Sequence, residues 1–179
     1  MLPATALKGV LAHRVAFHDN VLRARFAGEG GEAPRWGADS DAVRELFGTC
    51  VDDAKGQESG RGEPGRLRLS DVVLPAGLPS DVVQHNGIDR FTGGTLPGIL
   101  FSERVLRRGT RLQVQVEVER AQGVSSASKQ ALRRALRDLE RGRLQLGHGH
   151  GRGNGWVEGQ VRWSQAGEAW LEAGIGASS

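Results

Sequence analysis

Hydrophobic residues near the start of the chain recur with the period of a helix. Leu7, Val10, Leu11 and Val15 share one face of a repeat of about 3.6 residues. Thr5 precedes this stripe and belongs to the residue types that cap helix N-termini. The sequence therefore predicts a helix that begins almost at the first residue.

A second, shorter helix is expected around Ala42–Phe47, after a loop over residues 27–40 that is rich in glycine and proline. Asp39 or Ser40 is a suitable N-cap, because a side-chain oxygen there can accept a hydrogen bond from the first turn. Gly48 suits the C-terminal end of this helix, where a positive φ is often needed.

The clearest helical pattern covers residues 128–141. Charged residues, mostly arginines, line every side of it except one. Ser126 or Ser128 could cap this helix, and Gly142 could end it. The remaining side is an apolar stripe made of Ala131, Leu132, Ala135, Leu136 and Leu139.

Strands are predicted where apolar and polar residues alternate. The clearest alternation covers residues 111–119, and shorter ones cover residues 66–70, 99–106 and 155–163. Residues 80–98 have no clear period and are rich in turn residues.

Helices thus alternate with strand pairs, which is the order of an α+β fold with an antiparallel sheet and helices on one face. A ferredoxin-like βαββαβ unit fits this order. Such a unit begins with a strand, whereas only Met1 and Leu2 precede the first helix, so the first strand is expected to be absent. We expect a single domain over residues 1–179, with a frayed tail at residues 174–179.

The composition fits an ordinary folded domain. Apolar residues make up 38% of the 179 residues, which is enough for a core. No apolar run approaches the roughly 18 residues of a membrane span, and no signal-peptide pattern is visible. Cys50 is the only cysteine, which excludes an internal disulfide and a cysteine-based zinc cluster. A cytoplasmic setting is therefore expected.

The net charge is modest, but the basic residues are unusual. The formal net charge is +3, and of the 24 basic residues only Lys8, Lys55 and Lys129 are lysines. Arginine suits phosphate recognition, because its planar guanidinium binds two oxygens at once and stacks on bases. A GC-rich genome would also favour arginine codons, so composition alone leaves nucleic-acid binding open.

The most specific segment is a loop in which five glycines alternate with other residues, between a predicted helix and a predicted strand. Glycine lets a ligand approach the backbone closely, and successive backbone N–H groups can bind an anion. Arg152 could add charge-assisted hydrogen bonds to a phosphate. The loop consists of Gly147, His148, Gly149, His150, Gly151, Arg152, Gly153, Asn154 and Gly155.

Two known phosphate-binding motifs do not describe this loop. It lacks the Gly-Lys-Ser/Thr ending of a P-loop. The glycine motif of dinucleotide-binding folds follows a strand and opens a helix, which is the reverse order. A flexible hairpin or linker is the alternative interpretation, although the regular alternation argues against it.

The order of helix, glycine-rich loop and strand resembles the hallmark of the CRISPR-associated RAMP superfamily. Residues 3–11 (PATALKGVL) resemble the start of that family's first helix. Residues 46–48 (LFG) and 66–71 (RLRLSD) resemble two later segments. Residues 86–95 (NGIDRFTGGT), which continue into 98–103 (GILFSE), resemble the backbone subunits of type III complexes. These landmarks follow the family's order over nearly the whole chain.

The resemblance implies a subunit of a type III CRISPR effector complex that holds guide RNA by its backbone. Its partners would be the guide RNA, the complementary target RNA and other subunits, including copies of itself or close paralogues. Residues 81–98 match a thumb-like insertion that presses on the duplex of guide and target.

Three residues outside the loop receive RNA-contact roles from the resemblance. Lys8, in the first turn of its helix, would contact a phosphate, because a helix N-terminus also favours anions. Arg90 would contact a phosphate, and Phe91 would stack on a base. A solvated lysine and a core phenylalanine are the alternatives.

Cleavage of RNA is a second hypothesis. Histidine can act as a general acid or base near neutral pH, so His148 or His150 could serve a metal-independent endoribonuclease. The aspartate that the family uses for target cleavage lies upstream of the first helix, where this chain has only Met1 and Leu2. Asp19 is expected to follow that helix, so the role is not transferred to it. We therefore assign no catalytic residue.

Neither a metal nor a cofactor is expected. The two loop histidines have no neighbouring carboxylate or cysteine and fall short of the three or four ligands of a zinc site. A third hypothesis is a structural or interaction domain without RNA affinity. Such a domain would lack the steep salt dependence of phosphate binding.

Overall fold

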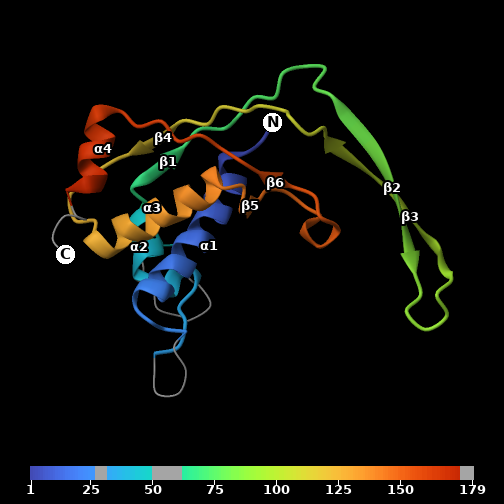
Figure 1. Cartoon of the computed structure of the whole chain (residues 1–179), viewed down its shortest axis with the longest axis horizontal. Coiled ribbons are helices and arrows are strands. Elements are labelled where there is room, and N and C mark those ends of the chain that lie inside the picture. Colours follow the sequence, from blue (N-terminus) through green and yellow to red (C-terminus); the bar gives the residue numbers. More distant parts are fainter. Residues whose placement is uncertain (27–31, 50–61, 174–179) are drawn as a thin grey trace. The chain divides into compact units, whose positions relative to one another are not determined.

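The computed structural model describes residues 1–26, 32–49 and 62–173, and it divides into two compact units (Figure 1). The hairpin unit contains Met1–Leu2 and Val72–Val114, and the helical unit contains Pro3–Asp71 and Gln115–Ser179. The single domain over residues 1–179 stays a prediction. The predicted frayed tail lies outside the described residues.

Among the described residues, the helical unit contains four α-helices and two short strand pairs. The first three helices pack against one another and bury the predicted apolar stripes. The helices are α1 (Ala4–Leu22), α2 (Asp41–Phe47), α3 (Ser126–Glu140) and α4 (Gln165–Glu172). The strands are β1 (Leu67–Leu69), β4 (Val116–Val118), β5 (Leu144–Gln145) and β6 (Trp156–Val157).

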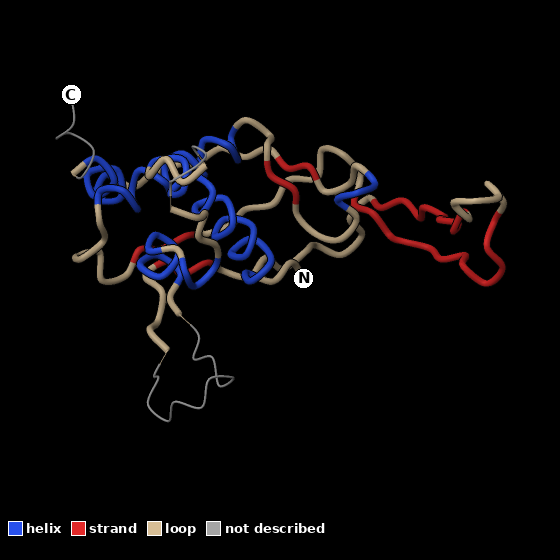
Figure 2. Tube along the Cα trace, turned by 90° about the horizontal axis from the view of Figure 1, so that it is seen from below, coloured by secondary structure: helices blue, strands red, loops and turns tan. Residues whose placement is uncertain are grey.

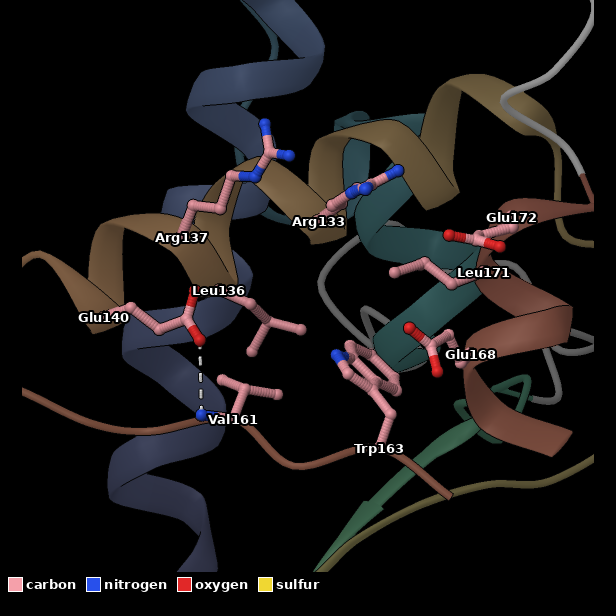
Figure 3. A pocket seen from close by; sticks show the side chains of 9 residues that line it. All are labelled: Arg133, Leu136, Arg137, Glu140, Val161, Trp163, Glu168, Leu171 and Glu172. Atoms are coloured by element: carbon pink, nitrogen blue, oxygen red, sulfur yellow. Dashed lines mark hydrogen bonds between the residues drawn. The ribbon is translucent and has the colours of Figure 1, made fainter. Parts of the chain in front are cut away.

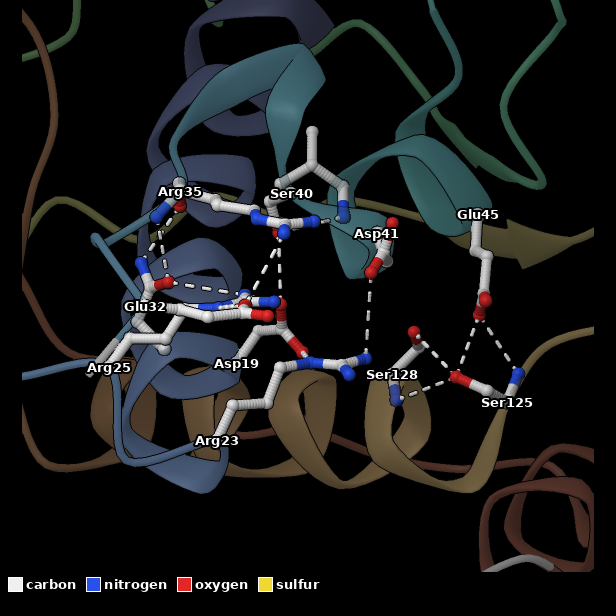
Figure 4. A network of polar contacts seen from close by, with 12 residues as sticks. Asp19, Arg23, Arg25, Glu32, Arg35, Ser40, Asp41, Glu45, Ser125 and Ser128 are labelled. Atoms are coloured by element: carbon white, nitrogen blue, oxygen red, sulfur yellow. Dashed lines mark hydrogen bonds and ion pairs between the residues drawn. The ribbon is translucent and has the colours of Figure 1, made fainter. Parts of the chain in front are cut away.

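The helix α1 is longer than its hydrophobic pattern predicts, because polar residues continue its buried side. Asp19 and Asn20 are both fully buried. The two carboxylate oxygens of Asp19 accept hydrogen bonds from Arg23 Nε at 2.8 Å and Arg25 Nη1 at 3.3 Å (Figure 4). A buried carboxylate with charged donors is tolerated where an unpaired one is not, so the helix continues to Leu22.

The N-terminus of α1 is capped from outside the helix. Pro3 occupies the N-cap position, and Thr5, the predicted cap, lies inside the first turn. The Asp71 Oδ1 atom accepts a hydrogen bond from the backbone N–H of Ala4 at 2.6 Å. Asp71, which is distant in the sequence, thus caps this helix in place of the predicted Thr5.

Serine side chains cap the N-termini of α2 and α3. The predicted cap of α2 is confirmed, because the Ser40 hydroxyl accepts a hydrogen bond from the Val43 N–H at 3.4 Å. The cap of α3 is Ser125, one residue before the predicted Ser126, and it accepts from the Ser128 N–H at 3.2 Å. Both ends therefore follow ordinary capping chemistry.

The strand β1 pairs antiparallel with β4, with Leu67 opposite Val118 and Leu69 opposite Val116. The strand predicted over residues 111–119 is therefore wrong in its length. Residues 111–114 belong to the hairpin unit and remain mostly exposed. Their alternation of apolar and polar residues therefore does not correspond to a buried face.

The strand predicted over residues 155–163 is also shorter than expected. Only Trp156–Val157 pair with β5, which the sequence did not predict. The chain then follows α3, where the Gly159 N–H donates to the Leu139 carbonyl at 3.1 Å. The helix α4 comes next and was missed, because it is short and buries Leu171 alone.

The hairpin unit is a long antiparallel pair of β2 (Ser80–Ile88) and β3 (Thr95–Leu106), drawn with red strands in Figure 2. β3 contains the strand predicted over residues 99–106. The sequence did not predict β2, because a strand exposed on both faces needs no alternation of apolar and polar residues. The predicted thumb segment, residues 81–98, lies mostly in β2 and in the turn after it.

These elements confirm an α+β fold with antiparallel strand pairing, which is compatible with the predicted ferredoxin-like arrangement. The described strands form three two-stranded ladders, β1–β4, β2–β3 and β5–β6. No helix in the described part of the chain is long and apolar enough to cross a membrane.

Candidate nucleic-acid interface

The glycine-rich loop connects β5 to β6 and is closed by a backbone hydrogen bond from the Leu146 N–H to the Gly155 carbonyl, 2.8 Å long. Gly155 has a φ of 86°, and a Cβ atom there would collide with the Leu146 carbonyl oxygen. A larger residue at this position would therefore prevent the hairpin from closing.

Inside the loop, a short 3₁₀ helix covers His150–Arg152. The Arg152 N–H donates to the Gly149 carbonyl at 2.9 Å, and the Asn154 N–H donates to the same oxygen at 3.4 Å. The guanidinium of Arg152 lies over Gly149, where a Cβ atom would come within 3.3 Å of it. Gly149 thus lets an arginine fold over the backbone of its own loop.

The other three glycines of the loop face open space. A Cβ atom added at Gly147, Gly151 or Gly153 would meet no atom within 4 Å. Two of these, Gly147 and Gly153, have positive φ, with values of 86° and 78°. The loop backbone is therefore open at these positions, and its binding of a ligand stays a prediction.

Three exposed side chains border this open backbone. His148 and Arg152 come from the loop, and Trp156 begins the strand after it. The indole of Trp156 is 59% exposed, which is unusual for so large an apolar ring. Sequence reasoning counted Trp156 as part of a strand and missed it as a contact residue. A tryptophan directly after a glycine-rich loop was the available signal.

Lys8 lies in the second turn of α1 rather than in the predicted first turn, because the helix begins at Ala4. The Asp71 carboxylate already binds the first N–H of that helix. Lys8 is half-buried, and within the described residues it makes no hydrogen bond or ion pair. Its ammonium group, rather than the helix terminus, is thus what an anion would meet.

Arg90 and Phe91 lie in the turn of the hairpin unit. Asp89 organises this turn: its carboxylate accepts hydrogen bonds from the Phe91 N–H at 3.0 Å and the Thr92 hydroxyl at 2.7 Å. These bonds, the one from Phe91 first, lower the pKa of Asp89. The Phe91 ring is 96% exposed, so the core interpretation of this residue is wrong.

Two aspartates of the helical unit have structural partners. Asp19 lies inside α1, not after it, and its carboxylate is fully buried against arginines. Asp138 in α3 is 4% exposed and accepts hydrogen bonds from Arg14 Nε at 2.7 Å and His18 Nε2 at 2.6 Å. Both carboxylates are therefore buried and accept hydrogen bonds from side chains of the same unit.

Burial and hydrogen bonding set the ionisation of this cluster. Burial lowers the pKa of His18 and outweighs the hydrogen bond to Asp138. Burial also acts to raise the pKa of Asp138, but the hydrogen bonds from Arg14 and His18 outweigh it, and the pKa is lowered. A neutral His18 therefore donates to an ionised Asp138. Across the described residues, no group of three or more His, Cys, Asp and Glu side chains could hold a metal ion.

The predicted contact residues are divided between the two units. Lys8 and the glycine-rich loop belong to the helical unit, whereas Arg90 and Phe91 belong to the hairpin unit. The side chain of His150 lies outside the described part of the chain.

A comparison with protein families gives a match to this chain. A sequence model described as the RAMP superfamily matches residues 1–158, which include α1, α3, the hairpin unit and the glycine-rich loop up to β6. No individual curated protein matches. Because the match covers far more than half of the 179 residues, the chain belongs to the RAMP superfamily, which supports a CRISPR-related, RNA-binding role.

Proposed function

We propose that this chain is a guide-RNA-binding subunit of a type III CRISPR interference complex. The observation that carries the proposal is the glycine-rich loop, where open backbone at Gly147, Gly151 and Gly153 lies beside the exposed Arg152. Backbone N–H groups and a guanidinium are suitable donors for RNA phosphates, and neither reads the base sequence.

Lys8 supports the same role from α1. Its ammonium group has no ion-pair partner among the described residues, and a phosphate would supply one. Together with Arg152 and the loop backbone, it would hold the guide by its phosphates. The choice of target would then come from base pairing between guide and target RNA.

The hairpin unit would contact the duplex of guide and target as the thumb does in related backbone subunits. Its turn presents Arg90 and the fully exposed ring of Phe91. A guanidinium can bind a phosphate, and an exposed aromatic ring can stack on a base. Other subunits, including copies of this chain, would cover further exposed apolar residues of β2 and β3.

The first test is to purify the chain with the proteins encoded beside it and to sequence the RNA that accompanies them. Short RNAs that share a repeat-derived end are the expected result. A preparation free of RNA would contradict the proposed function.

The second test addresses the contacts. Changing both Lys8→Ala and Arg152→Ala should weaken binding of single-stranded RNA and reduce the slope of log K against log salt by about 1.4, because each phosphate contact on a single strand contributes about 0.7. Binding and slope that match the unchanged chain would show that these two residues are not the contacts.

A further inference from the structure

A groove of about 180 Å³ lies between α3 and α4 (Figure 3), and no residue of the glycine-rich loop lines it. Residues 161–163 form its floor, and both walls carry charged side chains. Pockets for drug-sized ligands are larger, at about 300–1,000 Å³. The size therefore suits one flat group, such as a single nucleobase, rather than a duplex.

The two walls of this groove differ in charge. Arg133 and Arg137 lie one turn apart on α3 and form the basic wall, and Glu168 and Glu172 on α4 form the acidic wall (Figure 3). The indole of Trp163 lies between the two walls, and 36% of the residue is exposed.

The charged side chains of both walls lack partners. Within the described residues, the guanidinium groups of Arg133 and Arg137 make no hydrogen bond or ion pair, and neither do the carboxylates of Glu168 and Glu172. Like charges four residues apart on a helix repel each other, so two unpaired arginines at this spacing destabilise α3. An anionic ligand on the basic wall would remove that repulsion.

The indole of Trp163 is held in place by α4. Gly167 lies in the first turn of that helix, and a Cβ atom there would come within 3.3 Å of the Trp163 ring. Glycine inside a helix costs about 1 kcal/mol relative to alanine. Glycine at this position permits the close approach of the helix and the Trp163 ring.

We propose that this groove binds one nucleotide of single-stranded RNA, as a continuation of the strand held at the glycine-rich loop; the inference rests on the proposed function. A single strand has its phosphates on one side, its base in the middle and base amino groups on the other. Arginine on α3 pairs with the phosphate, Trp163 stacks on the base, and the α4 carboxylates accept hydrogen bonds from amino groups.

One chain segment joins the groove to the loop. Residues 156–163 begin at the end of the loop and run along α3 to the groove floor. The Gly159 N–H donates to the Leu139 carbonyl at 3.1 Å, which holds the middle of this segment against the helix. Its two ends carry the exposed rings of Trp156 and Trp163, so a strand leaving the loop meets a second stacking surface without leaving the unit.

The acidic wall explains why a single strand fits and a duplex does not. Glu168 and Glu172 would repel a second phosphate backbone on that side, whereas Glu140 lies on the α3 wall. Glu140 has a further contact, because its Oε1 accepts a hydrogen bond from the Val161 N–H at 3.4 Å and fixes the floor to α3. A peptide with both charges is the competing occupant, and it predicts a different outcome below.

The test uses the full chain and an oligoadenylate of about twelve nucleotides, because adenine stacks and carries an amino group. Trp163→Ala should raise the dissociation constant about fivefold or more, whereas Trp163→Phe, which keeps a ring, should leave it nearly unchanged. Arg137→Gln should weaken binding more than Arg141→Gln, a matched loss of charge at the C-cap of α3 and outside the groove. Ultraviolet cross-linking should attach RNA to the peptide that contains Trp163.

The outcomes separate the two proposals. If no groove variant changes the RNA affinity and cross-links form only in residues 147–156, the proposed nucleotide site in the groove is overturned and the proposed function stands. A chain that binds no RNA at all would overturn both. Groove variants that release another protein subunit without changing RNA affinity would show that a peptide occupies the groove, which also overturns the inference.

Discussion

The helical unit and the hairpin unit are stabilised in different ways. The helical unit buries apolar side chains such as Leu11, Leu46 and Ala135 to 2% exposure or less. In the hairpin unit, Val72 is the only buried apolar residue that the structure describes, and Leu100 on β3 is 70% exposed. A two-stranded hairpin without a core is marginal in water, and exposed apolar surface commonly marks a contact. The comparison indicates that the helical unit has a buried core, whereas the hairpin unit exposes apolar side chains that a partner could cover.

The largest expected difference between the units concerns ion pairs. Asp19→Asn should destabilise the chain by about 3–5 kcal/mol, because it removes the buried carboxylate that pairs with the buried Arg25 guanidinium and leaves only the exposed Glu32 carboxylate as a charged partner. The matched change in the hairpin unit is Asp81→Asn, whose pair with Arg107 is more than half exposed. That change should cost at most about 1 kcal/mol. Urea unfolding followed by circular dichroism measures both, and equal losses would remove the distinction between the units.

Apolar truncation should separate the units almost as strongly. Leu11→Ala in α1 should cost about 2–5 kcal/mol, since it leaves a cavity between packed helices. Leu100→Ala in β3 should stay within about 0.5 kcal/mol, because its side chain already meets solvent. Urea unfolding followed by circular dichroism measures both changes. A large loss of stability in Leu100→Ala would indicate a core in the hairpin unit.

A substitution in the turn of the hairpin unit should affect RNA binding more than stability. Phe91→Ala should leave stability unchanged but weaken binding to a duplex of guide and target RNA by about 1–3 kcal/mol, the value of one stacked base. Val73→Ala, at another highly exposed apolar position of the same unit, serves as the control and should change neither. A titration of labelled duplex measures the affinity. Equal effects of the two changes would indicate general loss of apolar surface rather than stacking.

The smallest expected effect is a pH dependence confined to the helical unit. The pKa of His18 is lowered by burial from its ordinary 6.5, so the unfolded chain binds more protons than the folded one just below that value. Stability should therefore be full above pH 6.5 and should fall as the pH decreases from there towards the folded pKa. Asp138, whose pKa is also lowered, adds a second loss below its ordinary 3.8. His18→Gln keeps a hydrogen-bond donor for Asp138 and should remove the first loss; an unchanged pH profile would contradict this account.

Local patterns predicted the elements whose partners are close in the sequence. The stripe in α3 is regular, and three of its five predicted residues, Ala131, Leu132 and Ala135, are buried, whereas Leu136 and Leu139 are half-buried. Ser40 was correctly predicted as a cap, because its partner Val43 is three residues away. The glycine-rich loop was found for the same reason, since five glycines in alternation need no distant partner to be recognised.

Elements that depend on distant partners were not predictable in the same way. β2 was missed because it pairs only with β3 and has no covered face. The extent of α1 depends on buried polar contacts of Asp19 with Arg25 and Ser40, which a hydrophobic pattern does not register. Trp156 and Trp163 looked like strand residues, and only their exposure beside the loop and the groove gave them a possible role.

The α+β class, the apolar sides of the helices and the glycine-rich loop can be read from neighbouring residues, because each follows from local chemistry. The tertiary structure decided which side chains remain exposed and which charges find partners. Phe91 is exposed because no described element covers the hairpin turn, whereas Asp19 is buried because two arginines and a serine converge on it. Exposure and pairing depend on which distant segments meet, and that information is present only once the chain has folded.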